Sequence, residues 1–226
     1  MRLSFLGLSL AALASAAPSD DGAVEARALT CANLGPLVTD NFDDRTVLPV
    51  SPEVSTLLSP TPNGTYINYT QAAYANIGSL TNQEIPSKPN DIYILPNTNK
   101  AILKPAFHRA NAFGLKSFRY VCLTRSFETI ITLPAKCTFT VSCNNWGAAG
   151  PASRTTSQTF TFDPISLVDF EFETAVFKPT FKYLSQCSIK VNSGKPAGLP
   201  LPSGLSKPLT ILAIDDVVNR GQLCTL

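Results

Sequence analysis

The sequence predicts an all-β protein, a two-sheet antiparallel β-sandwich of the jelly-roll type that is stapled by disulfides. Three observations support this fold class. Eighteen prolines and many Ser, Thr and Asn residues favour loops between short strands over helices. Short apolar runs alternate with polar residues between turn signals, and six cysteines occur in a chain that begins with an export signal. We expect about eight to ten short strands, a number typical of sandwiches, and little helix.

The N-terminus has the pattern of a secretory signal peptide. One Arg precedes an apolar run over residues 3–13, and small residues follow at 14–17. Cleavage at the end of this segment leaves about 210 residues, which suits one all-β domain better than two. We therefore expect a signal peptide at residues 1–17, a flexible leader at 18–30 and a single β-sandwich domain at 31–226.

Charge and hydropathy limit the compartment and the partners. The net charge is +2, the sequence pI is about 8.2, and Lys and Arg form no run. Nucleic acid is therefore not an expected partner, because neutralising phosphates needs a clustered basic face. No apolar stretch after the signal peptide is long enough to span a bilayer. We expect a secreted, extracellular monomer with no membrane span.

Alternation of apolar and polar residues identifies the stronger strands. In the segment 113–123, Phe118, Tyr120 and Cys122 lie on one face. In the segment 136–143, odd positions are apolar or Cys and even positions are polar, which is typical of a half-buried antiparallel strand. In chain order, the expected strands are residues 34–44, 92–95, 102–103, 113–123, 129–133, 136–143, 158–162, 168–173, 187–191 and 210–218.

The segments between these strands are expected to be loops, including residues 63–76 and 144–157. The closing segment, residues 210–218, is different because apolar residues fill both parities. Both of its faces should be covered, so it should be a central strand. Asp215 and Asp216 point to opposite sides of this strand. At least one of them should lie at the edge of the core, where a carboxylate needs backbone donors, a cation or a metal ion.

The six cysteines of an exported chain are expected to form three disulfides. Cys137 and Cys143 share parity, and an unbroken strand would hold them roughly 20 Å apart at ~3.3 Å per residue, so they should not bond each other. The preferred pairs are Cys31–Cys224, Cys122–Cys137 and Cys143–Cys187, and the last two pairs could be exchanged.

The order of several short motifs resembles a group of largely uncharacterised fungal secreted proteins with a galactose-binding-like jelly roll. Together the motifs cover most of the mature chain, and their order carries the resemblance. It implies a binding fold related to carbohydrate-binding modules and implies no reaction, because one fold hosts many functions. The motifs lie at residues 41–44, 64–66 with Tyr69 and Tyr74, 87–90, 113–117, 137–141 and 214–217.

Two acidic pairs come from opposite ends of the chain: Asp43 with Asp44, and Asp215 with Asp216. A disulfide between the chain ends would bring them together. Jelly-roll binding modules often hold a structural Ca²⁺ between their first and last strands, and carboxylate and carbonyl oxygens suit that ion. The alternative is that these acids cap turns and accept backbone hydrogen bonds. No cofactor is required for the expected function.

Trp146 is the only tryptophan, and it follows Asn144 and Asn145 in a polar segment. A loop aromatic beside side-chain amides is what a sugar-binding platform would use, with the ring stacking on a sugar and the amides bonding hydroxyls. The alternative is a tryptophan folded onto the end of the sandwich. We therefore name Trp146, Asn144 and Asn145 as ligand-binding candidates.

A second candidate surface contains Tyr66 and Tyr69. Two glycosylation sequons, at Asn63 and Asn68, occur in the same segment. Attached glycans would crowd a ligand site nearby, so this surface is the weaker candidate.

No catalytic group is expected. His108 is the only histidine, and neither a GxSxG nor an HExxH motif surrounds it. Asp169, Glu171 and Glu173 alternate with phenylalanines, which is typical of a solvated sheet face. The leading hypothesis is a non-catalytic secreted protein that binds carbohydrate or a cell-surface ligand through loops at one end. The alternatives are a fungal effector-like protein that binds a host protein and, third, a glycan-active enzyme.

Overall fold

The computed structural model describes residues 30–42, 55–56, 66–70, 73–75, 91–94, 101–106, 109–125, 132–147, 154–165, 171–196 and 209–225. This part of the chain is all-β and contains thirteen strands. They are β1 (Thr30–Asn33), β2 (Val38–Asp40), β3 (Ser55–Thr56), β4 (Ile67–Thr70), β5 (Ala73–Ala75), β6 (Asp91–Ile94), β7 (Ala101–Pro105), β8 (Ala112–Arg125), β9 (Thr132–Asn145), β10 (Thr155–Phe162), β11 (Glu173–Val176), β12 (Leu184–Pro196) and β13 (Leu209–Thr225). Within the same ranges, no helix has the length and apolar character needed to cross a membrane.

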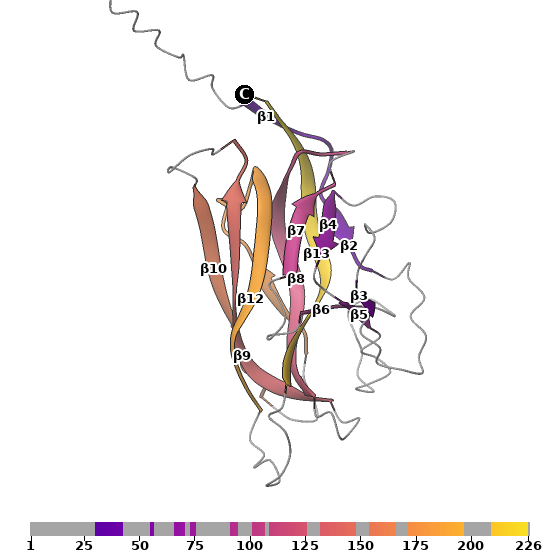
Figure 1. The fold of residues 1–226 in the computed structure, drawn as a ribbon, viewed down its shortest axis with the longest axis vertical. Coiled ribbons are helices and arrows are strands. Elements are labelled where there is room, and N and C mark those ends of the chain that lie inside the picture. The colour runs from indigo at the N-terminus through magenta and orange to yellow at the C-terminus, as the bar shows by residue number, and fades with distance from the viewer. Residues whose placement is uncertain are drawn as a thin grey trace, which may run out of the picture.

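The described strands form one antiparallel sheet that curls into a half-barrel (Figure 1). The main order is β3-β5-β6-β13-β8-β9-β12-β7-β4. Strands β1 and β2 add to β13, β10 adds to β9, and β11 adds to β8. The prediction of an all-β, antiparallel, disulfide-stapled fold is therefore confirmed.

β13 lies at the centre of this sheet. It pairs with β8 along most of its length, and its other edge pairs in turn with β6, β2 and β1. The neighbouring residues Ala213 and Ile214 point to opposite faces, yet both are buried. The expectation of a central closing strand is confirmed, and the strand continues to Thr225, beyond the segment 210–218.

A β-bulge interrupts β13 at its two aspartates. The register with β8 slips between Asp215 and Val218, and Asp216 has a positive φ of 47°. Aspartate tolerates this left-handed conformation better than most residues, which explains an acid at the bulge. The backbone N–H of Asp216 donates to Oδ1 of Asp215 at 2.8 Å, which satisfies part of a fully buried carboxylate.

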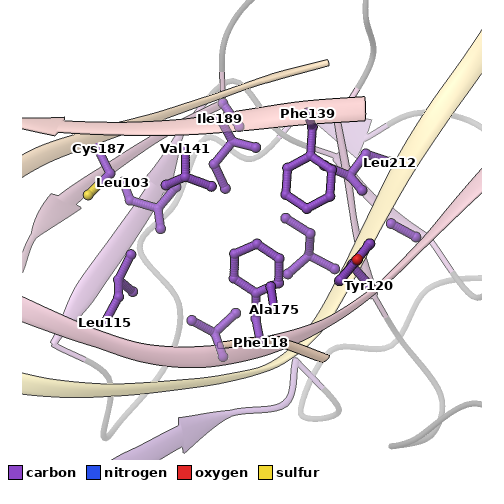
Figure 2. Close-up of a cluster of buried hydrophobic side chains, with 14 of the residues drawn as sticks. Leu103, Leu115, Phe118, Tyr120, Phe139, Val141, Ala175, Cys187, Ile189 and Leu212 are labelled. Carbon is purple, nitrogen blue, oxygen red and sulfur yellow. The ribbon is translucent and has the colours of Figure 1, made fainter. Parts of the chain in front are cut away.

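The curl of the sheet encloses an aromatic core. Figure 2 shows Phe139 and Ile189, from β9 and β12, facing Phe118 and Leu115 of β8 across the interior. The Phe118 and Phe139 rings stack with centroids 6.0 Å apart, and the Tyr120 ring meets Phe139 edge-on at 4.9 Å. The residues that the alternating pattern placed on one face of β8 and of β9 are therefore the residues that face the core.

Three disulfides fix the curl: Cys31–Cys224 joins β1 to β13, Cys122–Cys137 joins β8 to β9, and Cys143–Cys187 joins β9 to β12. These are the preferred pairs, and the exchanged pairing is not formed. The first pair closes 193 residues of chain, which restricts the unfolded state most strongly.

A seam of side-chain hydrogen bonds connects the edges of β10 and β11. The Gln158 amide donates to Val176 O at 2.9 Å and accepts from Lys178 N at 3.1 Å. Next to it, the hydroxyls of Thr156 and Thr180 are 3.2 Å apart. The amide of Gln158 therefore takes the place of a peptide group between two strand edges that share no backbone ladder.

Several expected boundaries were wrong. The segments 129–133 and 136–143 were expected to be separate strands, but residues 132–145 form the single strand β9, in which Pro134 pairs with Leu123 at the end of the β8 ladder. The expected loop 63–76 contains β4 and β5, because Ile67 and Tyr69 alternate into the core. Of the first expected strand, 34–44, only β2 is a strand among the described residues.

Candidate functional site

The candidate site lies at the end of the sheet where β9 stops and β12 starts. In register, Leu184 of β12 pairs with both Asn145 and Phe113. The backbone then turns at Trp146, whose N–H donates to Tyr183 O at 2.6 Å. On the opposite edge of β9, the Asn145 N–H donates to Arg154 O at 3.1 Å. Backbone hydrogen bonds therefore fix Trp146 to the residue before β12, and fix the last residue of β9 to the residue before β10.

The backbone at this end is conformationally demanding. Gly147 has φ of 75°, which glycine adopts freely, but Tyr183 has φ of 56°, which is uncommon for an aromatic residue. The Tyr183 N–H donates to Gln222 Oε1 at 2.8 Å, and Gln222 Nε2 donates to Asn33 Oδ1 at 3.0 Å. These bonds hold the unusual conformation, and strained backbone of this kind is concentrated at functional sites.

The side chains at this turn combine aromatic, amide and cationic groups. Trp146 and Asn145 are half-buried and Asn144 is exposed. Asn145 Nδ2 donates to Lys182 O at 3.3 Å, and Lys182 Nζ lies 5.2 Å from the centre of the Tyr183 ring. We call the set Asn144, Asn145, Trp146, Arg154, Lys182 and Tyr183 the Trp146 end.

The structure changes two expectations at the Trp146 end. Asn144 and Asn145 end strand β9, so only Trp146 lies in the turn. Arg154, Lys182 and Tyr183 were not predicted to belong to this site. They reach this site because β9 pairs with β10 and β12, which the local sequence does not reveal. The positive φ of Tyr183 is likewise not predictable from a tyrosine.

The second candidate surface is committed to packing. Tyr66 is half-buried, and a Cβ placed on Gly221 would lie 2.2 Å from its ring. The ring therefore rests on the bare backbone of β13, and only glycine leaves room for it there. The Tyr66 hydroxyl lies close to Gly35, 3.3 Å from where a Cβ on that residue would be.

Tyr69 is a core residue, with 4% of its surface exposed. Its hydroxyl donates to Asp40 Oδ2 at 2.7 Å, and its ring meets Phe42 edge-on at 5.2 Å. Asn219, itself fully buried, donates to the same Asp40 oxygen at 2.9 Å. Tyr69 thus joins β4 to β2 and β13 inside the protein and offers no open ring face to a ligand.

The structure describes one of the two acidic pairs, Asp215 with Asp216. Asp43 and Asp44 lie outside the described residues, so the calcium hypothesis stays a prediction. Asp215 is fully buried, and burial raises the pKa of the Asp216 carboxyl, which the charge of Arg119 partly opposes. Among the described residues, no group of three or more His, Cys, Asp or Glu side chains could hold a metal ion.

A part-buried hydrogen bond joins two ionisable groups away from the Trp146 end. The Tyr120 hydroxyl donates to Glu173 Oε2 at 2.8 Å and is 3.1 Å from Thr161 O. Burial, followed by the hydrogen bond and charge of Glu173, raises the pKa of Tyr120. The pair connects β8, β10 and β11, so Glu173 has a structural partner.

Several predicted residues lie outside the described ranges: Asn63, His108 and Asp169. Asn68 is described and half-buried in β4, opposite Lys104 of β7. Ile67 and Tyr69 on either side of it point into the core, so Asn68 points away from the core. Its glycosylation stays a prediction.

Comparison with known proteins identifies no family. No protein-family model matches the chain, and no curated protein is similar to it. The fold itself defines a class, an all-β, disulfide-rich protein built on a curled antiparallel sheet. Three disulfides are consistent with an extracellular protein, because disulfides persist in oxidising compartments.

Proposed function

We propose that this protein is a secreted, non-catalytic binding protein that engages carbohydrate through the Trp146 end. The observation that carries the proposal is the fixed position of Trp146. Its backbone N–H donates to Tyr183 O, the residue is half-buried, and the amides of Asn144 and Asn145 precede it. An indole face beside amide groups suits a sugar, whose C–H face stacks on the ring while its hydroxyls bond the amides.

A preorganised platform explains why this end is better suited to binding than the Tyr66 surface. Trp146 is bonded to Tyr183, and Asn145 before it is bonded to Arg154, so little conformational entropy is lost when a ligand binds. Tyr66 is covered on one face by the backbone at Gly221, and Tyr69 is buried. Trp146 and Tyr66 are both half-buried, but only Trp146 has side-chain amides next to it in the sequence.

We propose further that the curled sheet is a two-sheet jelly roll of the galactose-binding-like type. In support, β8 and β9 pair over only three positions, Leu123–Arg125 with Thr132–Pro134, before they separate. Beyond that point the core-facing sides of β8 and β9 oppose each other, as two sheets of a sandwich would. The order of the motifs along the sequence supports the same assignment.

A non-catalytic role agrees with the partners of the described carboxylates. Asp40 bonds Tyr69 and Asn219, Glu173 bonds Tyr120, and Asp163 pairs with Lys136. A glycosidase needs two carboxyl groups free to face one another across a bound sugar. These partners occupy three of the described carboxyl groups.

A glycan array tests the proposal. The wild-type protein should bind a defined set of saccharides, and Trp146→Ala should lose at least tenfold in affinity because the stacking surface is removed. Ile165→Ala is the matched control, since Ile165 is a fully exposed apolar side chain elsewhere. Loss in Trp146→Ala with retention in the control supports the proposal. Capture of a protein partner with no glycan binding would instead favour the effector-like alternative.

A further inference from the structure

We propose that the carbohydrate bound at the Trp146 end is acidic, with carboxylates that meet Arg154 and Lys182. This inference rests on the proposed function and names its ligand class. Both side chains are exposed cations on the two sides of the Trp146 turn. A chain of uronic acid residues has the required chemistry, because it offers sugar rings for stacking and a regular series of carboxylates for the cations.

Lys182 is held in place before any ligand arrives. Its carbonyl accepts from Asn145 Nδ2 at 3.3 Å, and its ammonium lies 5.2 Å from the centre of the Tyr183 ring. Tyr183 has a positive φ, and this backbone conformation places its ring beside Lys182. The hydrogen bond from the Tyr183 N–H to Gln222 Oε1 fixes that conformation. A lysine stacked on a ring loses less side-chain freedom on binding than a free one.

Arg154 approaches from the other side. Its carbonyl accepts from the Asn145 N–H, and the next residue, Thr155, contacts Asn144 Oδ1 through its hydroxyl at 3.4 Å. Arg154 directly precedes β10 and Lys182 lies two residues before β12, while β9 runs between those strands. Two strand spacings place the two backbones about 10 Å apart. Trp146 lies at the end of the strand between them.

The charge of these two cations is not neutralised by the described part of the chain. The ion pair found there joins Lys136 to Asp163, and Lys136 is nine residues from Asn145 along β9, up to about 30 Å away. Over that distance, salt screens the interaction at physiological ionic strength. The Trp146 end therefore has a positive local potential that a neutral sugar would not use.

The first test compares polygalacturonate with its fully methyl-esterified form, which keeps the sugar rings and removes the charge. The wild-type protein should bind polygalacturonate at least tenfold more tightly, and added salt should weaken it. The double variant Arg154→Gln/Lys182→Gln should lose that preference, because each charge-assisted hydrogen bond contributes about tenfold or more. Lys190→Gln, an exposed lysine in the middle of β12, is the matched control.

The second measurement needs no ligand. Trp146 is the only tryptophan, so its emission reports the local potential. With the quenching by each ion normalised to that of free N-acetyltryptophanamide, iodide should quench Trp146 more efficiently than caesium, and the double variant should remove the difference. Equal quenching by both ions in the wild type would overturn the inference, whatever the array shows.

Other outcomes separate this inference from the proposed function. Binding of the ester as tightly as the acid, with loss in Trp146→Ala, would keep a sugar-binding site and overturn its acidic ligand. Binding of polyglutamate as tightly as polygalacturonate would overturn the inference in favour of an acidic peptide. Absence of binding to every saccharide on the array and to both polygalacturonate forms would reject both proposals.

Discussion

The side-chain amide of Gln158 closes the gap between two strand edges by bonding Val176 O at 2.9 Å and, with its oxygen, Lys178 N at 3.1 Å. β10 pairs with β9 and β11 pairs with β8, so the two strands lie on different sides of the core. A side chain thus supplies a contact that backbone pairing does not make. The half-barrel depends on this seam for closure along one edge.

Gln158→Leu should destabilise the protein by about 1–2 kcal/mol, because two hydrogen bonds are lost and two backbone groups lose their partners. Urea unfolding followed by circular dichroism measures the change. Ser157→Ala, at the neighbouring exposed position of β10, is the control and should change the free energy of unfolding by less than about 0.5 kcal/mol. Equal changes in the free energy of unfolding for the two variants would show that the Gln158 hydrogen bonds do not stabilise the fold.

Gly221→Ala should destabilise the fold by about 1–3 kcal/mol through overpacking, because the new Cβ would lie 2.2 Å from the Tyr66 ring. Gly114→Ala is a matched control on the paired strand, where the nearest atom to a Cβ is 3.5 Å away. In a double variant with Tyr66→Ala, the cost of Gly221→Ala should largely disappear. Additive costs would mean that Tyr66 does not pack on Gly221.

Tyr69→Phe should cost about 1–3 kcal/mol, because it removes a donor from the buried Asp40 carboxylate while keeping the ring. Tyr183→Phe, at a half-buried ring, should cost less. Urea unfolding of both variants distinguishes a core tyrosine from a surface one. A free energy of unfolding unchanged in Tyr69→Phe would show that the hydroxyl does not stabilise the fold.

Asp216→Asn should increase stability at neutral pH relative to the wild type. Burial raises the folded-state pKa of Asp216 above its ordinary value of 3.8, so the folded state binds more protons in the window above 3.8. The stability that the protonated Asp216 contributes is therefore lost as pH rises through that window. The asparagine side chain of the variant does not titrate, so the variant does not lose this stability. The two proteins should have the same pH slope below pH 3. A wild-type advantage at pH 7 would show that the attraction to the Arg119 charge dominates.

The sequence predicted those parts of the fold that depend on local periodicity. The inward parity of Cys137 and Cys143 excluded their pairing, and the apolar residues at both parities of the closing strand identified its central place. Tyr69 was assigned to a polar loop because a sequon surrounds it. Only two alternating residues, Ile67 and Tyr69, mark it as part of a strand, and so short a pattern is ambiguous.

The candidate site was predicted only in part, for a related reason. Trp146 and its amides are adjacent in sequence, so their composition was visible. Lys182 and Arg154 reach the same turn through strand pairing, which depends on the register of three strands. The Tyr183 N–H, at a positive φ, donates to Gln222, 39 residues away, and this arrangement has no local signal in the sequence.

Titration of the Trp146 emission with oligogalacturonate tests the central claim most directly, because this chain has a single tryptophan. We predict a saturable change in emission and protection of Trp146 from acrylamide quenching at saturation. Ile165→Ala should behave as the wild type. Saturable binding measured by calorimetry with no change in Trp146 emission or quenching would contradict the assignment of the site to this end of the sheet.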